Sequence, residues 1–239
     1  MNNIKVCFSV DYFRKYADNK SIVVVVDVLR ATSVISIAFE NGIKEIIPVK
    51  SLEDTFQYKN KKDHILAAER NTIKVSGFNY GNSPYDYIGS HIQNKTLVLT
   101  TTNGTKAIKQ AKDHHVITAS FINIDIVVEY LKYKKTDVII LCSGWKGFFN
   151  LEDTIFAGAL SQKLIATKSF LSNCDSLSAA LQLYNNSKAD IFNFLASSSY
   201  RKRNNSDKII KDTKFCLKPS IKSKIVPILK NQKLVVEDF

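Results

Sequence analysis

Two clusters of polar residues in this 239-residue sequence come directly after short apolar runs. The first covers residues 27–32, after the apolar run 22–26, and the second covers residues 100–105, after the run 97–99. In open α/β sheets, ligands bind just beyond the carboxyl ends of the strands, at the starts of the following helices. Two clusters of this kind indicate an enzyme that handles an anionic substrate.

Asp27 is the first candidate for chemistry, because a carboxylate at the end of a central strand is held rigidly at the sheet edge. There it could hold Mg²⁺ or meet a phosphoryl group, and Arg30 could clamp a phosphate or carboxylate with two hydrogen bonds. The alternative is structural: Asp27 caps the following helix and Arg30 pairs with it. A haloacid dehalogenase-type phosphatase needs a second aspartate where this chain has Leu29, so that motif is excluded.

The second cluster contains Thr102, Asn103, Gly104 and Thr105, which bring hydroxyl groups, an amide and backbone N–H groups to one predicted helix start. Such a helix N-terminus binds oxyanions through its free N–H groups and its dipole. The density of polar groups favours anion binding. A threonine-rich helix cap without a ligand is the alternative.

A third segment joins the strand-ending carboxylate of Glu69 and its neighbour Arg70 to a glycine-containing loop that reaches Asn82 and Ser83. Ser83 before Pro84 is typical of a helix N-cap with proline at the first helical position, and this explanation is sufficient alone. The glycines in the loop permit a ligand to approach the backbone closely, which is a weak signal by itself.

Glu152 and Asp153 lie at the start of another predicted helix, after Asn150. Acidic residues in a first helical turn are explained either by the helix dipole or by metal binding. Metal binding is favoured when polar residues from several strand ends come together. The strands of one parallel sheet bring their polar ends to the same edge, where such a site can form.

The cysteines and histidines give no sign of a metal cage or a disulfide framework. The cysteines have no CxxC spacing, so we expect reduced thiols, and a nucleophilic Cys142 at the end of a predicted strand stays open. The histidines lack metal-ligand spacing and are predicted to lie on the surface. These residues are Cys7, Cys142, Cys174 and Cys216, and His64, His91, His114 and His115.

The formal net charge of +12 comes mainly from lysines scattered along the chain. A nucleic-acid reader usually has a localised basic stripe with arginines or stacking aromatics, so nucleic-acid binding is not favoured. No apolar run reaches the roughly 18 residues of a membrane span, and the start of the chain lacks a secretory signal. We therefore expect a cytoplasmic protein with a small anionic substrate and no membrane partner; the resemblance described below implies that this substrate is phosphorylated.

Apolar runs of strand length alternate with helix-like segments, which predicts an α/β fold. The run 22–26 is apolar throughout and is typical of a central strand covered by helices on both faces. Gly42 is a predicted helix C-cap and Ser51 a predicted N-cap. The predicted strands are residues 5–10, 21–26, 45–49, 95–100, 115–118 and 137–141, and the longer predicted helices are residues 33–41, 103–111, 151–166 and 175–184.

The final third of the chain changes character. Residues 197–205 are polar and basic, a short helix is predicted over residues 207–212, and residues 224–228 and 233–236 are predicted to form a closing hairpin. The basic segment is either a solvated loop or a lid over an anionic substrate. No repeat or linker stands out, so we expect one domain over residues 1–239.

Together these segments resemble the 2-phosphosulfolactate phosphatase family in type, order and spacing, from about residue 4 to residue 227. Each motif alone is weak evidence for the family. All five together, in the same order and at the same spacing, are specific for it. The segments that carry the resemblance are residues 27–32 (DVLRAT), 69–71 (ERN), 81–84 (GNSP), 101–105 (TTNGT), and 144–147 (GWKG) with 151–154 (LEDT).

The resemblance implies a Mg²⁺-dependent phosphoric monoester hydrolase that splits 2-phosphosulfolactate into sulfolactate and phosphate, a step toward coenzyme M. It also implies a layered α/β/α fold around a mixed, largely parallel sheet. The site residues that it implies are Asp27, Arg30, Glu69 and Arg70 for catalysis; Thr32, Asn82, Ser83, Thr102, Asn103, Gly104 and Thr105 for substrate or phosphate; and Asp27, Glu69, Glu152 and Asp153 for the metal.

The chain departs from the family pattern at several positions. Ala68 stands where the family has glycine, Asn79 where it has aspartate, and Lys106 where it has arginine. A Ser-x-His pattern of the family is replaced around residues 197–200 by a segment without histidine. If that histidine protonates the leaving oxygen or binds the sulfonate, substrate preference or activity differs in this chain.

The sequence leaves several alternatives open. Phosphate could be transferred directly to water or through a phosphoenzyme formed on Asp27. The substrate could be another small phosphorylated carboxylic acid, and a non-catalytic protein of the same fold that binds anions or nucleic acid is the alternative from another class. The sequence does not reveal the oligomeric state, for which a homodimer is one alternative.

Overall fold

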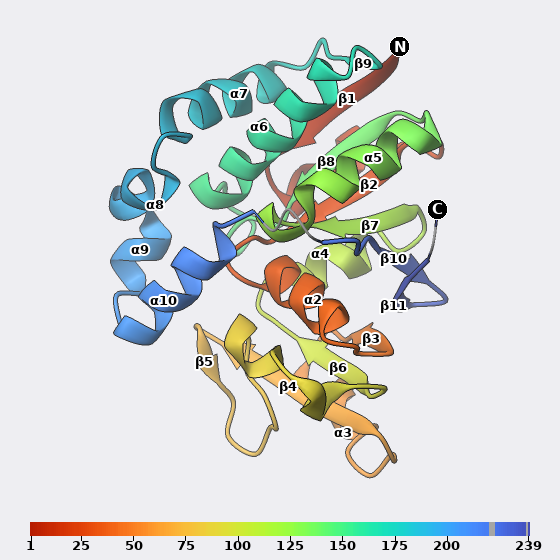
Figure 1. The fold of residues 1–239 in the computed structure, drawn as a ribbon, viewed down its shortest axis with the longest axis vertical. Coiled ribbons are helices and arrows are strands. Elements are labelled where there is room, and N and C mark those ends of the chain that lie inside the picture. Colours follow the sequence, from red (N-terminus) through yellow and green to blue (C-terminus); the bar gives the residue numbers. More distant parts are fainter. Residues whose placement is uncertain (220–222, 238) are drawn as a thin grey trace.

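A computed structural model describes residues 1–219, 223–237 and 239 of the chain. Its strands form one sheet in the order β5-β4-β6-β3-β11-β10-β7-β2-β8-β1-β9, with helices along both faces (Figure 1). The predicted α/β class, layered around a mixed and largely parallel sheet, is confirmed. The strands are β1 (Asn2–Cys7), β2 (Ile22–Val26), β3 (Glu45–Pro48), β4 (His64–Arg70), β5 (Ile73–Lys74), β6 (Thr96–Thr100), β7 (His115–Ala119), β8 (Val138–Cys142), β9 (Phe170–Leu171), β10 (Pro227–Lys230) and β11 (Lys233–Val236).

The helices follow the strands in the alternation that the sequence predicted. The capping box predicted at Ser51 is present, and Gly42 ends its helix with a φ of 86°, a left-handed conformation that glycine adopts without strain. The helices are α1 (Phe13–Tyr16), α2 (Ala31–Glu40), α3 (Leu52–Phe56), α4 (Gly104–Gln110), α5 (Ile124–Lys134), α6 (Leu151–Ala166), α7 (Asp175–Ser187), α8 (Ile191–Phe194), α9 (Ser199–Arg203) and α10 (Asp207–Cys216), with short 3-10 turns that include Pro84–Tyr87 and Phe121–Asn123.

Strand β2 lies inside the sheet, parallel to β7 on one side and to β8 on the other. All five of its residues are buried, as the uninterrupted apolar run predicted. Val24 and Val26 pack into the core beneath α5 and α6, whereas Val23 and Val25 pack into the core beneath α2 and α4. Burial on both faces fixes the position of the residue that follows the strand, Asp27.

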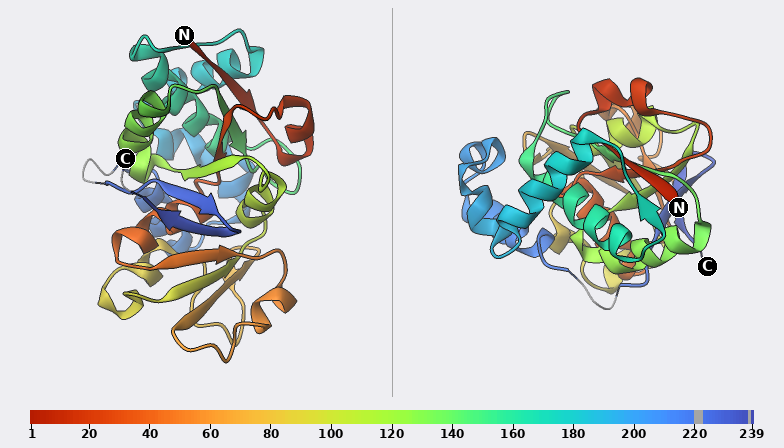
Figure 2. Two further views of the ribbon diagram at one scale, coloured as in Figure 1. Left: turned by 90° about the vertical axis from the view of Figure 1, so that its right-hand side faces the viewer. Right: turned by 90° about the horizontal axis from the view of Figure 1, so that it is seen from above.

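The C-terminal hairpin lies in the middle of the sheet (Figure 2, left). β10 pairs with β11 and with β7, and β11 also pairs with β3, in each case antiparallel. The hairpin was predicted from the sequence, but its position was not. It joins a parallel part made of β7, β2, β8, β1 and β9 to a second part made of β3, β6, β4 and β5.

Several predicted bounds differ from the structure. β1 lies at Asn2–Cys7 instead of residues 5–10, because the side chain of Ser9 caps a 3-10 turn and ends the strand. The basic segment 197–205 contains the helix α9, capped by Ser198, so its interpretation as a loop was wrong. α10 continues to Cys216 where the sequence indicated residues 207–212. Within the described residues, no helix is both long and apolar enough to cross a membrane.

Candidate active site

Asp27 lies at the end of β2 and is buried, with 8% of its surface exposed. Its backbone N–H donates to Thr32 Oγ1 (3.1 Å), and its Oδ1 accepts a hydrogen bond from the Ala31 N–H at the start of α2 (3.4 Å). Helix α4 passes directly beside it: a Cβ on Gly104 would lie 2.7 Å from Asp27 Oδ2. Glycine at position 104 is therefore what allows α4 to pack against this carboxylate.

Three further carboxylates lie around Asp27. Glu69 comes from the end of β4, and Glu152 and Asp153 come from the first turn of α6. Burial holds the pKa of Asp27 well above its usual range, and the negative charges of Asp153 and then Glu69 add to the effect. Burial, followed by the charge of Asp153, also raises the pKa of Glu152 to about 7. A cluster of buried carboxylates with raised pKa values is typical of a site for a cation or for acid–base chemistry.

Asp153 differs from the other three because its oxygens are fully engaged. Oδ1 accepts from the Val28 N–H (2.9 Å), and Oδ2 accepts from Ser143 Oγ (3.0 Å), the Gly144 N–H (3.3 Å) and Asn150 Nδ2 (2.9 Å). Burial still raises its pKa to about 6 despite these donors. Asp153 thus connects the ends of β2 and β8 to the start of α6, and it does not line the candidate pocket.

Arg30 does not pair with Asp27, as one interpretation of the sequence had it. Its Nη1 forms a buried salt bridge with Asp212 of α10, and its Nη2 donates to the carbonyl oxygen of Thr72 (3.0 Å). The other oxygen of Asp212 accepts from Ser83 Oγ (2.7 Å), so the Ser83 side chain does not cap the turn that follows it. Arg30 and Asp212 are 3% and 0% exposed, and both ends of the pair are held in place.

The side chains of the threonine-rich segment after β6 fall into two groups: some line the candidate pocket, and others form hydrogen bonds within the segment. Thr102 and Asn103 line the candidate pocket, and Thr102 Oγ1 lies 3.4 Å from Glu69 Oε1. Thr101 and Thr105 instead satisfy each other: the Thr105 N–H donates to Thr101 Oγ1 and the Thr101 N–H donates to Thr105 Oγ1, both at 3.2 Å. The hydroxyl of Thr105 is therefore used within the cap of α4.

These groups meet in a small, partly enclosed cavity of about 20 Å³, which we call the acidic pocket. Its volume is close to that of a single water site. It is lined by Asp27, Leu29, Arg30, Glu69, Thr72, Asn82, Thr102, Asn103, Gly144, Trp145, Asn150, Glu152 and Tyr200.

Seven of the residues implied by the family resemblance thus meet in the acidic pocket. The other six do not line it, and for all thirteen a role in catalysis or in substrate or metal binding stays a prediction. The seven are Asp27, Arg30, Glu69, Asn82, Thr102, Asn103 and Glu152, and the six are Thr32, Arg70, Ser83, Gly104, Thr105 and Asp153. Arg70 is held by the Glu69 carbonyl oxygen (2.7 Å) and by Thr100 Oγ1 (3.2 Å).

Three lining side chains carry a buried polar atom without a hydrogen-bond partner among the described residues: Asn82 Oδ1, Glu152 Oε2 and Tyr200 Oη. The Thr213 hydroxyl lies near Tyr200 but donates to the Ile209 carbonyl oxygen (2.7 Å). Buried polar atoms are nearly always paired, so these three atoms leave hydrogen-bonding capacity in the cavity for a ligand or for water. Burial raises the pKa of Tyr200, which keeps its hydroxyl protonated and able to donate.

Sequence reasoning missed several of these residues. Tyr200 and Asp212 reach the site from the C-terminal third, where the sequence showed only a basic segment and a short helix. Trp145 was part of a recognised motif without a role of its own, and the guanidinium of Arg203 stacks on its ring at 4.3 Å. No local sequence pattern predicts that an arginine will stack on a tryptophan at a pocket. This pair is therefore recognised only from the tertiary structure.

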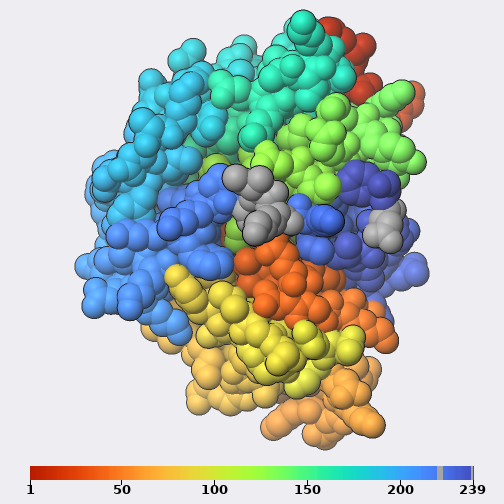
Figure 3. All heavy atoms as spheres, in the orientation of Figure 1, coloured from red at the N-terminus to blue at the C-terminus, as the bar shows by residue number. Residues whose placement is uncertain are grey.

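The segment from α8 to α10 closes one side of the molecule, next to the turn after β4 (Figure 3). Thr72 Oγ1 in that turn donates to Asn204 Oδ1 just after α9 (2.9 Å). Tyr200 on α9 is a lining residue, and Arg203 on α9 covers Trp145. The acidic pocket is therefore enclosed in part by α9.

The remaining candidates lie outside the acidic pocket. Burial raises the pKa of the Cys142 thiol well above its usual range, which does not favour a nucleophilic thiolate. All four cysteines are free, and no histidine lines the pocket. Among the residues that the structure describes, no three histidine, cysteine, aspartate or glutamate side chains converge as a ready-made metal cage.

Comparison with known proteins agrees with these features. A family model described as 2-phosphosulpholactate phosphatase matches residues 7–232. A protein of Thermotoga maritima named probable 2-phosphosulfolactate phosphatase is 40% identical over 90% of this chain and 92% of its own length. Proteins of the same name from Caldanaerobacter subterraneus subsp. tengcongensis (38% identical; 87% of this chain, 88% of the relative) and Clostridium botulinum (34%; 97% and 98%) are similar over nearly their whole lengths. This chain belongs to the 2-phosphosulpholactate phosphatase family, a family of phosphoric monoester hydrolases.

Proposed function

We propose that this chain hydrolyses the phosphate monoester of 2-phosphosulfolactate to sulfolactate and phosphate, with Mg²⁺ as cofactor. The observation that carries the proposal is the acidic pocket, where buried carboxylates, Arg30 and three unpartnered polar atoms meet at the ends of β2 and β4 and the start of α6. The names of the relatives supply the substrate. By the family resemblance, the reaction would take place in the cytoplasm, on a route to coenzyme M.

Charge balance supports a bound cation. Asp27, Glu69 and Glu152 line the acidic pocket, and the cationic side chain among its lining residues, Arg30, already pairs with Asp212. Phosphate, sulfonate and carboxylate groups on the substrate are all anionic. Bringing them against buried carboxylates is unfavourable unless a cation lies between the two sets of charges.

Asp27 and Glu152 are the residues that would hold Mg²⁺. Glu152 Oε2 has no partner, whereas the oxygens of Asp153 are all engaged and Glu69 Oε1 accepts from the Thr72 N–H. Mg²⁺ commonly takes one or two carboxylates and completes its shell with water and substrate phosphate, so a preformed cage of three side chains is not required. When bound, it would stabilise the charge that develops on the phosphoryl oxygens.

The protein side chains would position the substrate. Arg30 is fixed by Asp212 and by the Thr72 carbonyl oxygen, and its remaining N–H groups can donate to an anionic oxygen. The protonated Tyr200 hydroxyl can donate a second hydrogen bond. Donors that are already in place when the reaction begins lower the barrier, because they need not reorganise.

The test is phosphate release from a panel of phosphorylated hydroxy acids that includes 2-phosphosulfolactate, with Mg²⁺ and with a chelator. We expect turnover that needs Mg²⁺ and that falls about 100-fold or more in Asp27→Asn. The exposed Asp113→Asn is the matched control and should keep full turnover. Folded protein that releases no phosphate from any substrate would contradict the proposal, and turnover of a different phosphorylated carboxylic acid would replace the substrate but keep the reaction.

The route of phosphoryl transfer has its own test. A phosphoenzyme on Asp27 would be trapped by acid quenching and detected by mass spectrometry of the peptide that contains it. Direct attack by water would leave no phosphorylated Asp27 at any stage of turnover. A substrate that is chiral at phosphorus separates the two routes, because one in-line displacement inverts the configuration and two successive displacements retain it.

A further inference from the structure

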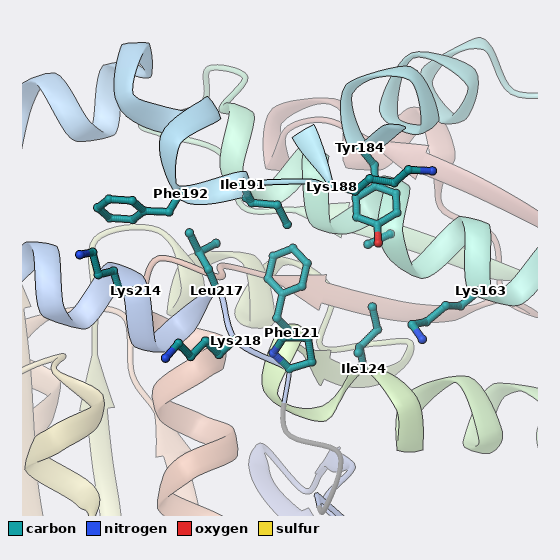
Figure 4. A pocket seen from close by; sticks show the side chains of 12 residues that line it. Phe121, Ile124, Lys163, Tyr184, Lys188, Ile191, Phe192, Lys214, Leu217 and Lys218 are labelled. Carbon is teal, nitrogen blue, oxygen red and sulfur yellow. The ribbon is translucent and has the colours of Figure 1, made fainter. Parts of the chain in front are cut away.

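A second cavity, of about 400 Å³, lies among α6, α7, α8, α10 and the turn Phe121–Asn123 (Figure 4). It shares no lining residue with the acidic pocket. We call it the lysine-rimmed pocket, and its lining is Phe121, Ile124, Ala159, Lys163, Tyr184, Lys188, Ile191, Phe192, Lys214, Leu217, Lys218 and Pro219. No step of the proposed phosphatase reaction uses these residues.

The interior of the lysine-rimmed pocket is apolar. Phe121, Ile124, Ala159 and Leu217 form its floor and are each at most 9% exposed. Ile191 faces the same space from α8 (Figure 4). A cavity of this size with mostly apolar walls lies in the range of pockets that hold one small molecule.

The rim is positively charged. Among the described residues, four lysines and no acidic residue contribute to the lining. Lys163 pairs with Asp125 outside the cavity (2.9 Å), and Lys188 donates to Asn185 Oδ1 (3.0 Å). Lys214 lies over the Phe192 ring, 4.9 Å from its centroid. In the part of the chain that the structure describes, neither Lys214 nor Lys218 is in a salt bridge, so both ammonium groups remain available to an anion.

We propose that the lysine-rimmed pocket binds an amphipathic anion, specifically an aliphatic carboxylate of medium length. Its hydrocarbon tail would lie against Phe121, Ile124 and Leu217, where it displaces water from apolar surface. Its carboxylate would lie at the rim, beside Lys214 and Lys218. The pocket matches both parts of such a ligand. Its apolar interior can bind the hydrocarbon tail, and the four lysines of its rim can bind a single negatively charged headgroup.

The probe for the test is decanoate, titrated by calorimetry at concentrations at which it is monomeric. We expect saturable binding to the intact protein, weaker binding of uncharged decanol, and no detectable binding of acetate. Lys214→Gln together with Lys218→Gln should weaken decanoate binding about fivefold, because each exposed ion pair contributes little and two add up. Lys211→Gln, an exposed lysine of the same helix outside the lining, is the matched control and should bind as the natural protein does.

A second variant tests the tail site. Ile191→Glu would place a carboxylate beside the ligand tail at a half-buried position, and it should abolish binding while the melting temperature reports whether the protein is folded. Turnover of the phosphatase substrate should stay unchanged in the lysine variants, which separates this proposal from the function proposed above. Absence of decanoate binding, or binding that the lysine pair and Ile191→Glu both leave intact, would overturn the assignment.

Discussion

The side chains of the acidic pocket differ in what they can do, although the sequence presents them as one set of carboxylates. Both carboxylate oxygens of Asp153 accept hydrogen bonds from neighbouring donors, whereas one buried oxygen of Glu152 has no partner. Tyr200 likewise keeps an unpartnered hydroxyl. These unpartnered atoms can still form hydrogen bonds with a ligand. Single substitutions of Glu152 and Tyr200 therefore give the most specific predictions.

Glu152 should make the stability of the metal-free protein depend on pH. Its pKa rises from a usual 4.5 to about 7 on folding, so the folded state binds this proton more tightly than the unfolded state. The corresponding stabilisation, about 3 kcal/mol, is present below pH 4.5 and is lost as the pH rises through 7. Urea unfolding with a chelator should therefore show a steeper loss of stability with pH in the natural protein than in Glu152→Gln.

The exposed Glu129→Gln serves as the control for that series and should follow the natural protein. Added Mg²⁺ should reverse the loss of stability near neutral pH in the natural protein, because a cation stabilises the ionised carboxylate. Parallel pH curves for the natural protein and Glu152→Gln would show that this carboxyl does not titrate as its burial implies.

Tyr200→Phe separates a role in substrate binding from a role in packing. Removal of a hydroxyl that donates to an anionic oxygen should lower kcat/KM roughly 10- to 100-fold. The melting temperature should stay the same or rise, because the hydroxyl is buried without a partner in the free protein. Tyr133→Phe, at an exposed tyrosine, should change neither quantity. A fall in the melting temperature with unchanged kinetics would assign the hydroxyl to packing.

Among the elements, α9 and α10 complete a site that the strand ends only begin. α10 supplies Asp212 to Arg30, and α9 supplies Tyr200 to the pocket and Arg203 to the ring of Trp145. The acidic pocket beneath them has room for about one water molecule, so we expect a covering element to move when the substrate enters. α9 is the shorter of the two covering helices, with five residues.

The two arginines of α9 allow a matched test of that covering role. Arg203 stacks on Trp145, which lines the acidic pocket, whereas Arg201 stacks on Phe192, which lines the lysine-rimmed pocket instead. We expect Arg203→Ala to raise KM about threefold to tenfold, because one cationic contact at the pocket is lost, and Arg201→Ala to leave KM unchanged. Steady-state kinetics at constant ionic strength measures both. Equal KM values for Arg203→Ala and the natural protein would contradict a lid function for α9.

The whole molecule depends on the position of its C-terminal hairpin. β10 and β11 connect the part of the sheet that carries Asp27 to the part that carries Glu69, and these two carboxylates face the same pocket. α2 and α4 add contacts across the same junction. The geometry of the acidic pocket is thus coupled to residues at the far end of the chain.

Leu234→Ala tests this coupling. Leu234 is fully buried in β11 and pairs with Ile46 of β3, so its truncation should cost about 2–4 kcal/mol of stability. Val235→Ala, on the same strand but half-buried, should cost less. Hydrogen exchange should show faster exchange in both β2 and β6. Loss of protection confined to one part of the sheet would mean that the two parts unfold independently.

The sequence alone determined the features that depend on neighbouring residues. Apolar runs gave the six predicted strands, and cap residues such as Ser51 and Gly42 marked helix ends, because strand burial and helix capping act over a few positions. The prediction that the polar groups after β2, β4 and β6 lie at one edge assumed a common strand direction, but three antiparallel pairings set β4 and β6 opposite to β2. These groups nevertheless meet in the acidic pocket. The family resemblance pointed to the residues that meet there, including Asp27, Glu69 and Glu152.

Only the tertiary structure decided the partners that are remote in the chain. Arg30 pairs with Asp212, 182 positions away, and Tyr200 reaches the pocket from a segment whose local sequence indicated a loop. The hairpin entered the middle of the sheet instead of an edge. Such pairings depend on which surfaces remain unpaired after the local elements form, and local periodicity carries no information about that choice.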